Sequence, residues 1–142
     1  MVASGGQKTE VLLWDPATGE LIENLKGAAV AFDIAFSPDG ITLASVRENP
    51  AIYLRNLQTG KQTLIRNKDM VWASCIAYSP DGNTLATGTT RGSIFIFDAN
   101  TGDLRKRYKG DGREINSIAF SPNSKTLATN SHGGVIYLWD AE

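Results

Sequence analysis

The sequence has few of the residues from which catalytic and metal sites are built. Its 142 residues include one cysteine and one histidine. A single cysteine excludes an intrachain disulfide and any multi-cysteine metal site, and a zinc site needs several His, Cys or carboxylate ligands. Cys75 lies in the apolar stretch WASCIAYSP, which indicates a small core side chain. We therefore expect neither a metal nor a cofactor.

The chain also lacks an excess of charge of one sign and long apolar runs. Lys and Arg number 14 against 15 Asp and Glu, which gives a net charge of −1. A nucleic-acid or anionic-membrane partner favours a basic face, so we expect neither partner. No apolar run approaches the ~20 residues that span a bilayer, and the first residues, MVASGGQKTE, lack the apolar core of a signal peptide. A cytoplasmic location is the resulting expectation.

One short polar motif returns at a fixed interval. FSPDG occupies 36–40, YSPDG 78–82 and FSPNS 120–124, so the interval is 42 residues both times. Three further series keep the same phase: the turns DPATG, NLQTG and DANTG, the strand starts LASVR, LATGT and LATNS, and the segments VLLWD, IYLRN, IFIFD and IYLWD. A period of this length is typical of solenoids, propellers or arrays.

Each repeat is predicted to form four short strands. DIAFSPDGITLAS predicts a strand, a turn and a strand, because proline presets one turn position and glycine supplies backbone freedom at another. AIYLRNLQTGKQTLI predicts two more strands. The third strands, such as SIFIFD, are apolar on both faces, which is typical of burial on both sides. Small sheets packed radially meet that requirement, so we predict an all-β propeller of four-stranded antiparallel blades.

The repeats resemble the WD-repeat β-propeller family. The resemblance rests on LWD at 13–15 and 138–140, on the three A[FY]SP turns and on the LA[ST] strand starts, and it extends over essentially the whole chain. It implies a non-catalytic scaffold for protein–protein interaction. Because this fold hosts many unrelated roles, the resemblance specifies the fold more closely than the function.

The repeats depart from the family pattern in a consistent way. The family's blades often carry a buried hydrogen-bonded tetrad of a Gly-His pair, a turn Asp, a strand Ser or Thr, and a Trp. Here the Gly-His positions read KGAA, NKDM and KGDG, and Arg55 and Phe97 replace two of the tryptophans. The turn Asp positions hold Lys8, Asn49, Arg91 and Gly133. We therefore expect stability to depend mainly on burial between blades.

The ends of the chain are out of phase with the repeat. The motifs predict strands two to four of a first blade in 1–25, two whole blades in 26–66 and 67–108, and strands one to three of a last blade in 109–142. That is about 3.4 repeats, whereas closed propellers typically have about 4–8 blades. An open arc exposes apolar faces and strand edges. We therefore predict that the arc closes with a second copy, as a homodimer with an even number of blades.

Two alternatives to self-closure stay open at this point. The missing remainder of a longer propeller could complete the ring, or the chain could be a fragment or a designed self-assembling unit without an evolved partner. A propeller enzyme with a central-channel pocket is less favoured, because it would need several titratable groups at one mouth. The sequence shows only dispersed charges.

The resemblance also implies where a protein or peptide partner binds. In the family, partners contact the face formed by the loops between blades and by the turns between second and third strands. Tryptophan and arginine are the types that most often become interface hot spots. By position, the candidate face in this chain comprises Lys8, Arg47, Glu48, Asp69, Trp72, Arg91, Asp111, Arg113 and His132.

Overall fold

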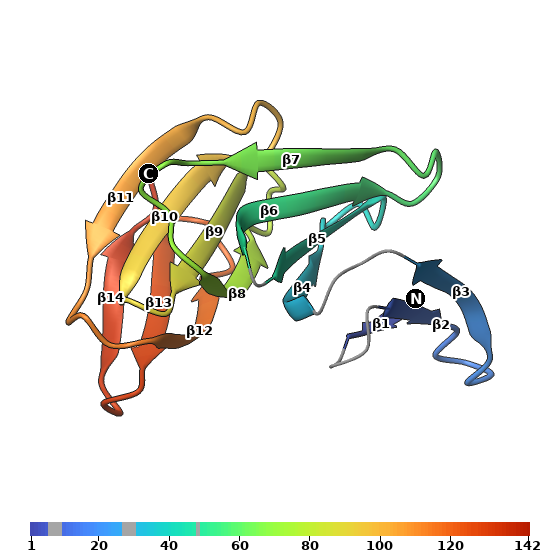
Figure 1. The fold of residues 1–142 in the computed structure, drawn as a ribbon, viewed down its shortest axis with the longest axis horizontal. Coiled ribbons are helices and arrows are strands. Elements are labelled where there is room, and N and C mark those ends of the chain that lie inside the picture. The colour runs from blue at the N-terminus through green and yellow to red at the C-terminus, as the bar shows by residue number, and fades with distance from the viewer. Residues whose placement is uncertain (6–9, 27–30, 48) are drawn as a thin grey trace.

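The computed structural model describes residues 1–5, 10–26, 31–47 and 49–142 (Figure 1). These ranges form fourteen strands and contain no helix, so none of them could cross a bilayer as a helix. Blade 1 consists of β1 (Val2–Ser4), β2 (Glu10–Trp14) and β3 (Leu21–Lys26). Blade 2 consists of β4 (Ala31–Phe36), β5 (Thr42–Arg47), β6 (Asn49–Asn56) and β7 (Gln62–Arg66).

The second half of the chain repeats this pattern. Blade 3 consists of β8 (Ala73–Tyr78), β9 (Thr84–Thr89), β10 (Ser93–Asp98) and β11 (Leu104–Lys109). Blade 4 consists of β12 (Ile115–Phe120), β13 (Thr126–Ser131) and β14 (Ile136–Asp140). In every blade, strands that follow one another in the chain pair antiparallel. The predicted all-β fold with four-stranded antiparallel blades is confirmed.

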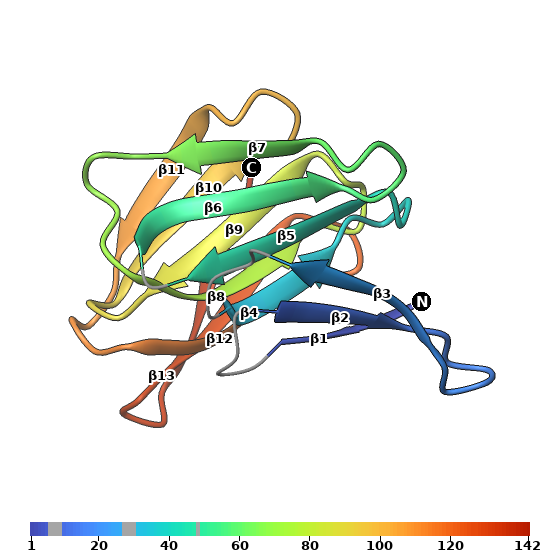
Figure 2. The ribbon, with the colours of Figure 1, turned by 45° about the vertical axis from the view of Figure 1, so that its right-hand side comes forward.

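The blades stack face to face in an arc that does not close. Blade 2 lies directly against blade 3 (Figure 2), and blades 1 and 4 occupy opposite ends (Figure 1). The first strands, β4, β8 and β12, contact one another in turn along the inner side. Two side chains join these strands across blades: Asp33 accepts a 2.8 Å hydrogen bond from the Ile76 amide, and the Ser74 hydroxyl donates to the Ile115 carbonyl at 2.6 Å.

The hydrophobic core is divided into three clusters, each between two neighbouring blades. The third strand of blade 3 shows why. Phe95 and Phe97 pack toward blade 2, whereas Ile94 and Ile96 pack toward blade 4, and all four are buried. The sequence prediction that this strand is buried on both faces is therefore correct.

The Ser-Pro turns are closed by their own side chains. The Ser37 hydroxyl accepts a hydrogen bond from the Thr42 amide at 2.9 Å and donates to Asp39, and Gly40 leaves the turn with a φ of 71°. In the third copy of the turn, Ser124 holds the glycine position with a φ of 63°. A residue with a side chain is strained in this left-handed region.

One hydrogen bond of the tetrad is present in the two blades that keep a tryptophan. The Trp14 indole donates to the Ser4 hydroxyl, and the Trp139 indole donates to the Thr129 hydroxyl, both at 2.9 Å. These bonds fix each indole on the same side of its blade. In blade 4 this side is packed against blade 3. In blade 1 the same side lies at the open end of the arc.

Candidate interaction surfaces

Several of the loop residues that the sequence singles out gather at one edge of blades 3 and 4. We call this group the loop face; its described members are Trp72, Arg91, Asp111, Arg113 and His132. Lys8 and Glu48 lie outside the described residues.

Trp72 and Arg91 line a common hollow of about 600 Å³, with Pro50, Met70, Val71 and Thr90 as its other walls. The Thr90 amide donates to the Trp72 carbonyl at 3.0 Å, which holds the two loops together. Trp72 is 56% exposed, whereas Met70 is buried beneath the hollow. The volume lies in the range of ligand pockets, about 300–1,000 Å³, and an exposed tryptophan above an apolar floor is typical of a protein-binding hot spot.

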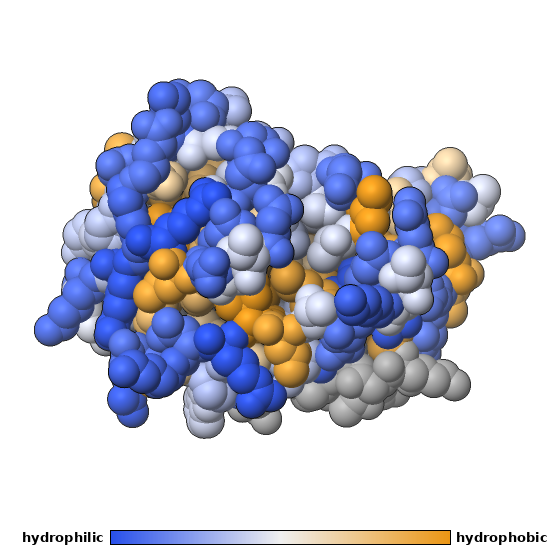
Figure 3. Space-filling view, turned by 90° about the horizontal axis from the view of Figure 1, so that it is seen from above, coloured by the Kyte–Doolittle hydropathy of each residue, from blue (hydrophilic) through white to orange (hydrophobic). Residues whose placement is uncertain are grey.

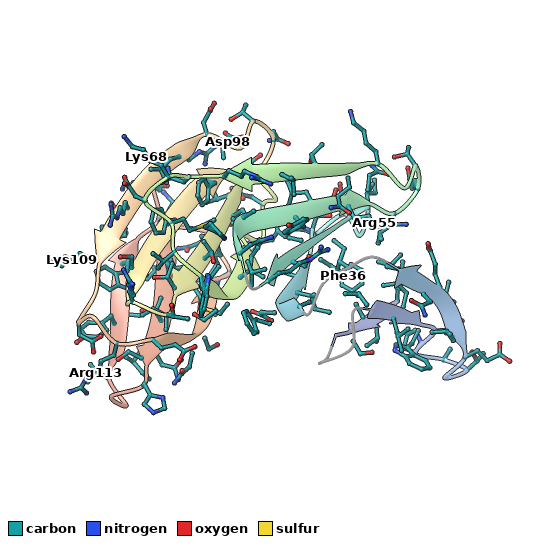
Figure 4. The ribbon with its side chains drawn as sticks, viewed as in Figure 1. Phe36, Arg55, Lys68, Asp98, Lys109 and Arg113 are labelled. Atoms are coloured by element: carbon teal, nitrogen blue, oxygen red, sulfur yellow. The ribbon has the colours of Figure 1, made fainter. Side chains whose placement is uncertain are left out.

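The loop face continues from this hollow into blade 4. Gly92 lies against the backbone of Gly112 and Arg113, where an added Cβ would be 2.7 Å from the Arg113 carbonyl oxygen. The glycine therefore allows the loops of blades 3 and 4 to touch. Arg113 extends outward at this corner of the arc (Figure 4), and its guanidinium lies against the turn that carries His132.

Asp111 anchors the blade 4 part of the loop face. It accepts hydrogen bonds from the Arg113 amide at 3.0 Å and from the Ser131 hydroxyl at 2.9 Å. These bonds lower the pKa of Asp111, so its carboxylate is ionised at neutral pH. The His132 amide donates to the Glu114 carbonyl at 2.9 Å, which fixes the neighbouring turn.

Two of the predicted face residues are engaged elsewhere. Asp69 pairs with Arg107 of β11 at 3.5 Å, on the outer side of blade 3. The placement of Arg47 on an exposed face is wrong, because Arg47 is only 6% exposed. Its guanidinium lies 3.8 Å from the centre of the Tyr53 ring, where it is covered by blade 1.

The two ends of the arc form a second kind of surface. On the last blade, strand alternation and register place six residues on the side that faces no other blade. We call this set the C-terminal face: Ser117, Ala119, Ala128, Asn130, Ile136 and Leu138. Ile136 and Leu138 are each 71% exposed, whereas the residues at the same repeat positions in blade 3, Ile94 and Ile96, are 0% exposed.

The first blade presents the matching side of the repeat. The N-terminal face comprises Val2, Ser4, Leu12 and Trp14, whose repeat equivalents in blade 4 are Leu127, Thr129, Tyr137 and Trp139. Val2 is 49% exposed, whereas Leu127 is fully buried against blade 3. Hydrophobic side chains reach the surface at this end of the molecule, on the right in Figure 3.

The described residues offer little catalytic chemistry. They contain no group of three or more His, Cys, Asp and Glu side chains that could hold a metal ion. Burial raises the pKa of the Cys75 thiol to about 12, so the thiolate that would act as a nucleophile is scarce at neutral pH.

Sequence reasoning alone did not find the walls of the Trp72 hollow. Pro50 and Met70 belong to none of the four repeating series, and they meet only because blades 2 and 3 stack. The exposed faces at the ends could be foreseen, because the phase of the repeat predicts an open arc.

The sequence matches the model of a known protein family. The family model described as "WD domain, G-beta repeat" matches residues 61–98 and 102–140, which together are more than half of the chain. Each matched segment spans one fourth strand and the three strands that follow it in the next blade. No curated protein matches the sequence.

Proposed function

Because this chain belongs to the WD-repeat family, whose repeats generally act as scaffolds for protein–protein interaction, we propose that it is a non-catalytic scaffold that assembles with a second copy of itself. The C-terminal face of each copy packs against the N-terminal face of the other. The observation that carries this proposal is the exposure of Leu138, 71% against 0% for its repeat equivalent Ile96. Burying a leucine side chain contributes about 1.5–3 kcal/mol.

The two faces are complementary because the chain already contains a copy of their contact. Between blades 3 and 4, Ile96 packs in one cluster with Leu127 and, at its border, Trp139. The N-terminal face presents Val2 and Trp14 at the corresponding repeat positions. A second copy can therefore cover Leu138 with side chains of the kind that already cover Ile96.

The pairing of β3 favours stacking of whole sheets over exchange of strands. β3 is hydrogen-bonded to β2 over Glu10 to Trp14, so moving it to the free edge of β14 would break an existing sheet. Stacking breaks no backbone hydrogen bond. Two copies related by a twofold axis would then form a closed ring of eight sheets.

The proposal is tested by placing a charge on the C-terminal face. Leu138→Asp buries a carboxylate in the proposed contact, so we expect sedimentation velocity to show a single-chain species where the unaltered protein shows a dimer. Leu64→Asp is the matched control, because Leu64 is exposed on β7 of blade 2, which is not one of the two terminal blades. Equal sedimentation of all three proteins as single chains would overturn self-assembly and favour completion by the remainder of a longer propeller.

The loop face supports the binding of a further protein partner. Trp72 stands above an apolar floor, and Arg91 lines the same hollow and supplies a positive charge. We therefore infer that a peptide segment with an apolar anchor enters the Trp72 hollow. A peptide library selected against the unaltered chain tests this inference. Enriched peptides should lose at least about tenfold in affinity with Trp72→Ala, which corresponds to 1.4 kcal/mol, and should keep it with Leu64→Ala. Undiminished binding to Trp72→Ala would exclude the hollow.

A further inference from the structure

Two arginines occupy the interface between blades 1 and 2, at positions that hold other residue types in the other blades. Arg47 on β5 takes the repeat position of Thr89 and Ser131, and Arg55 on β6 takes the position of Trp139. Arg55 lies at the side of blade 2 that faces blade 1 (Figure 4). This interface is therefore charged where the next two are apolar or hydroxylated.

The positive charge at this interface is only partly compensated by the described residues. Arg55 Nη2 lies 3.5 Å from Glu23 Oε1. For Arg47, no carboxylate within the described ranges lies at ion-pair distance, and its guanidinium lies over the ring of Tyr53. The Nε–H groups of both arginines are buried and donate to no acceptor in the described part of the chain. A buried charge without a counter-charge is destabilising, and an arginine does not release its proton to avoid that cost.

Both arginines line one small cavity. Its volume is about 20 Å³, and its other walls are Val11, Leu25, Leu43, Ser45, Tyr53 and Gln62. A space of at least about 10–15 Å³ admits one water-sized particle. Among the described side chains, the single carboxylate of Glu23 compensates one of the two guanidinium groups, which leaves one positive charge. The three aliphatic walls can accept no hydrogen bond.

We propose that this cavity binds a small monovalent anion, of which chloride is the physiological example. Arg47 and Arg55 supply the charge and the N–H donors, and the Ser45 hydroxyl supplies a further donor. A space of about 20 Å³ suits one small ion better than sulfate, phosphate or a carboxylic acid, and the one positive charge left by the described residues matches one monovalent ion. A water molecule would fill the same volume but would leave the charge uncompensated. The bound anion joins β5 and β6 to blade 1, so it stabilises the contact between the first two blades.

The first test measures the stability of the full chain in different salts at one ionic strength. Sodium chloride and sodium bromide should raise the midpoint of thermal unfolding in a saturable way, since a ligand that binds only the folded state stabilises it. Sodium gluconate should not, because its anion cannot enter the cavity. Arg47→Met should remove the difference between the salts, whereas Arg66→Met, on exposed β7, should keep it.

The second test detects the ion directly and does not need the variant to fold. The ³⁵Cl resonance of a sodium chloride solution should broaden when the unaltered protein is added, and bromide should reverse the broadening by competition. Equal unfolding midpoints in chloride and gluconate, together with no ³⁵Cl broadening that bromide reverses, would overturn the proposal and leave the cavity to water.

Discussion

We expect contacts between blades to contribute most of the stability, and two residues at equivalent repeat positions allow this expectation to be measured. Ile96 is fully buried between blades 3 and 4, so Ile96→Ala should lower the free energy of unfolding by about 2–5 kcal/mol. Leu138 occupies the same repeat position in blade 4 and is 71% exposed. In a single chain only about a third of the Leu138 side chain is buried, so Leu138→Ala should lower the free energy of unfolding by only about 0.5–1 kcal/mol.

Self-assembly predicts that the cost of Leu138→Ala depends on protein concentration. In the dimer Leu138 is covered as Ile96 is, so its truncation should approach the cost of Ile96→Ala. Urea unfolding followed by tryptophan fluorescence at low and high protein concentration measures both values. A cost below about 1 kcal/mol for Ile96→Ala would refute the claim that inter-blade burial holds the fold. A cost for Leu138→Ala that does not change with concentration would refute the covered end face.

Three further substitutions test local features of the fold. Gly88→Ala should destabilise the protein by about 1–3 kcal/mol, because the added Cβ would lie 2.6 Å from the Cβ of Ile115. Ser124→Gly should stabilise it by about 0.5–1 kcal/mol, because glycine relieves the left-handed backbone of that turn. Burial raises the pKa of Asp33 above its ordinary value of 3.8, so the folded state binds a proton more tightly than the unfolded state. The contribution of Asp33 to the free energy of unfolding therefore falls as pH rises from its ordinary pKa through its raised pKa in the folded state, and Asp33→Asn should remove this fall.

Urea unfolding measures all three effects, the last of them as a function of pH. A neutral Gly88→Ala would mean that blades 3 and 4 can move apart at no cost. A destabilising Ser124→Gly would mean that the 3.2 Å hydrogen bond from the Asp81 amide to the Ser124 hydroxyl outweighs the backbone strain. If the free energy of unfolding varies with pH in the same way for the unaltered protein and for Asp33→Asn, the Asp33 carboxyl is not desolvated.

The sequence predicts the architecture well because the fold repeats. A fixed period of 42 residues places every Ser-Pro turn, and the apolar run in β10 requires burial on both faces. Individual side chains are harder to place. Arg47 occupies a loop-proximal position that suggests solvent exposure, yet the ring of Tyr53 draws its guanidinium inward. The Trp72 hollow depends on Pro50 of β6 and on Met70 in the connection between blades 2 and 3, and their approach is set by stacking rather than by local pattern.

Self-assembly is the central claim, and the mass of the unaltered chain in solution tests it most directly. One chain has a mass of 15.3 kDa. Light scattering coupled to size exclusion should give twice that mass, over a range of loading concentrations. A mass of one chain that persists at the highest concentration would contradict the account, because the exposed Ile136 and Leu138 would then be stable in water without a partner.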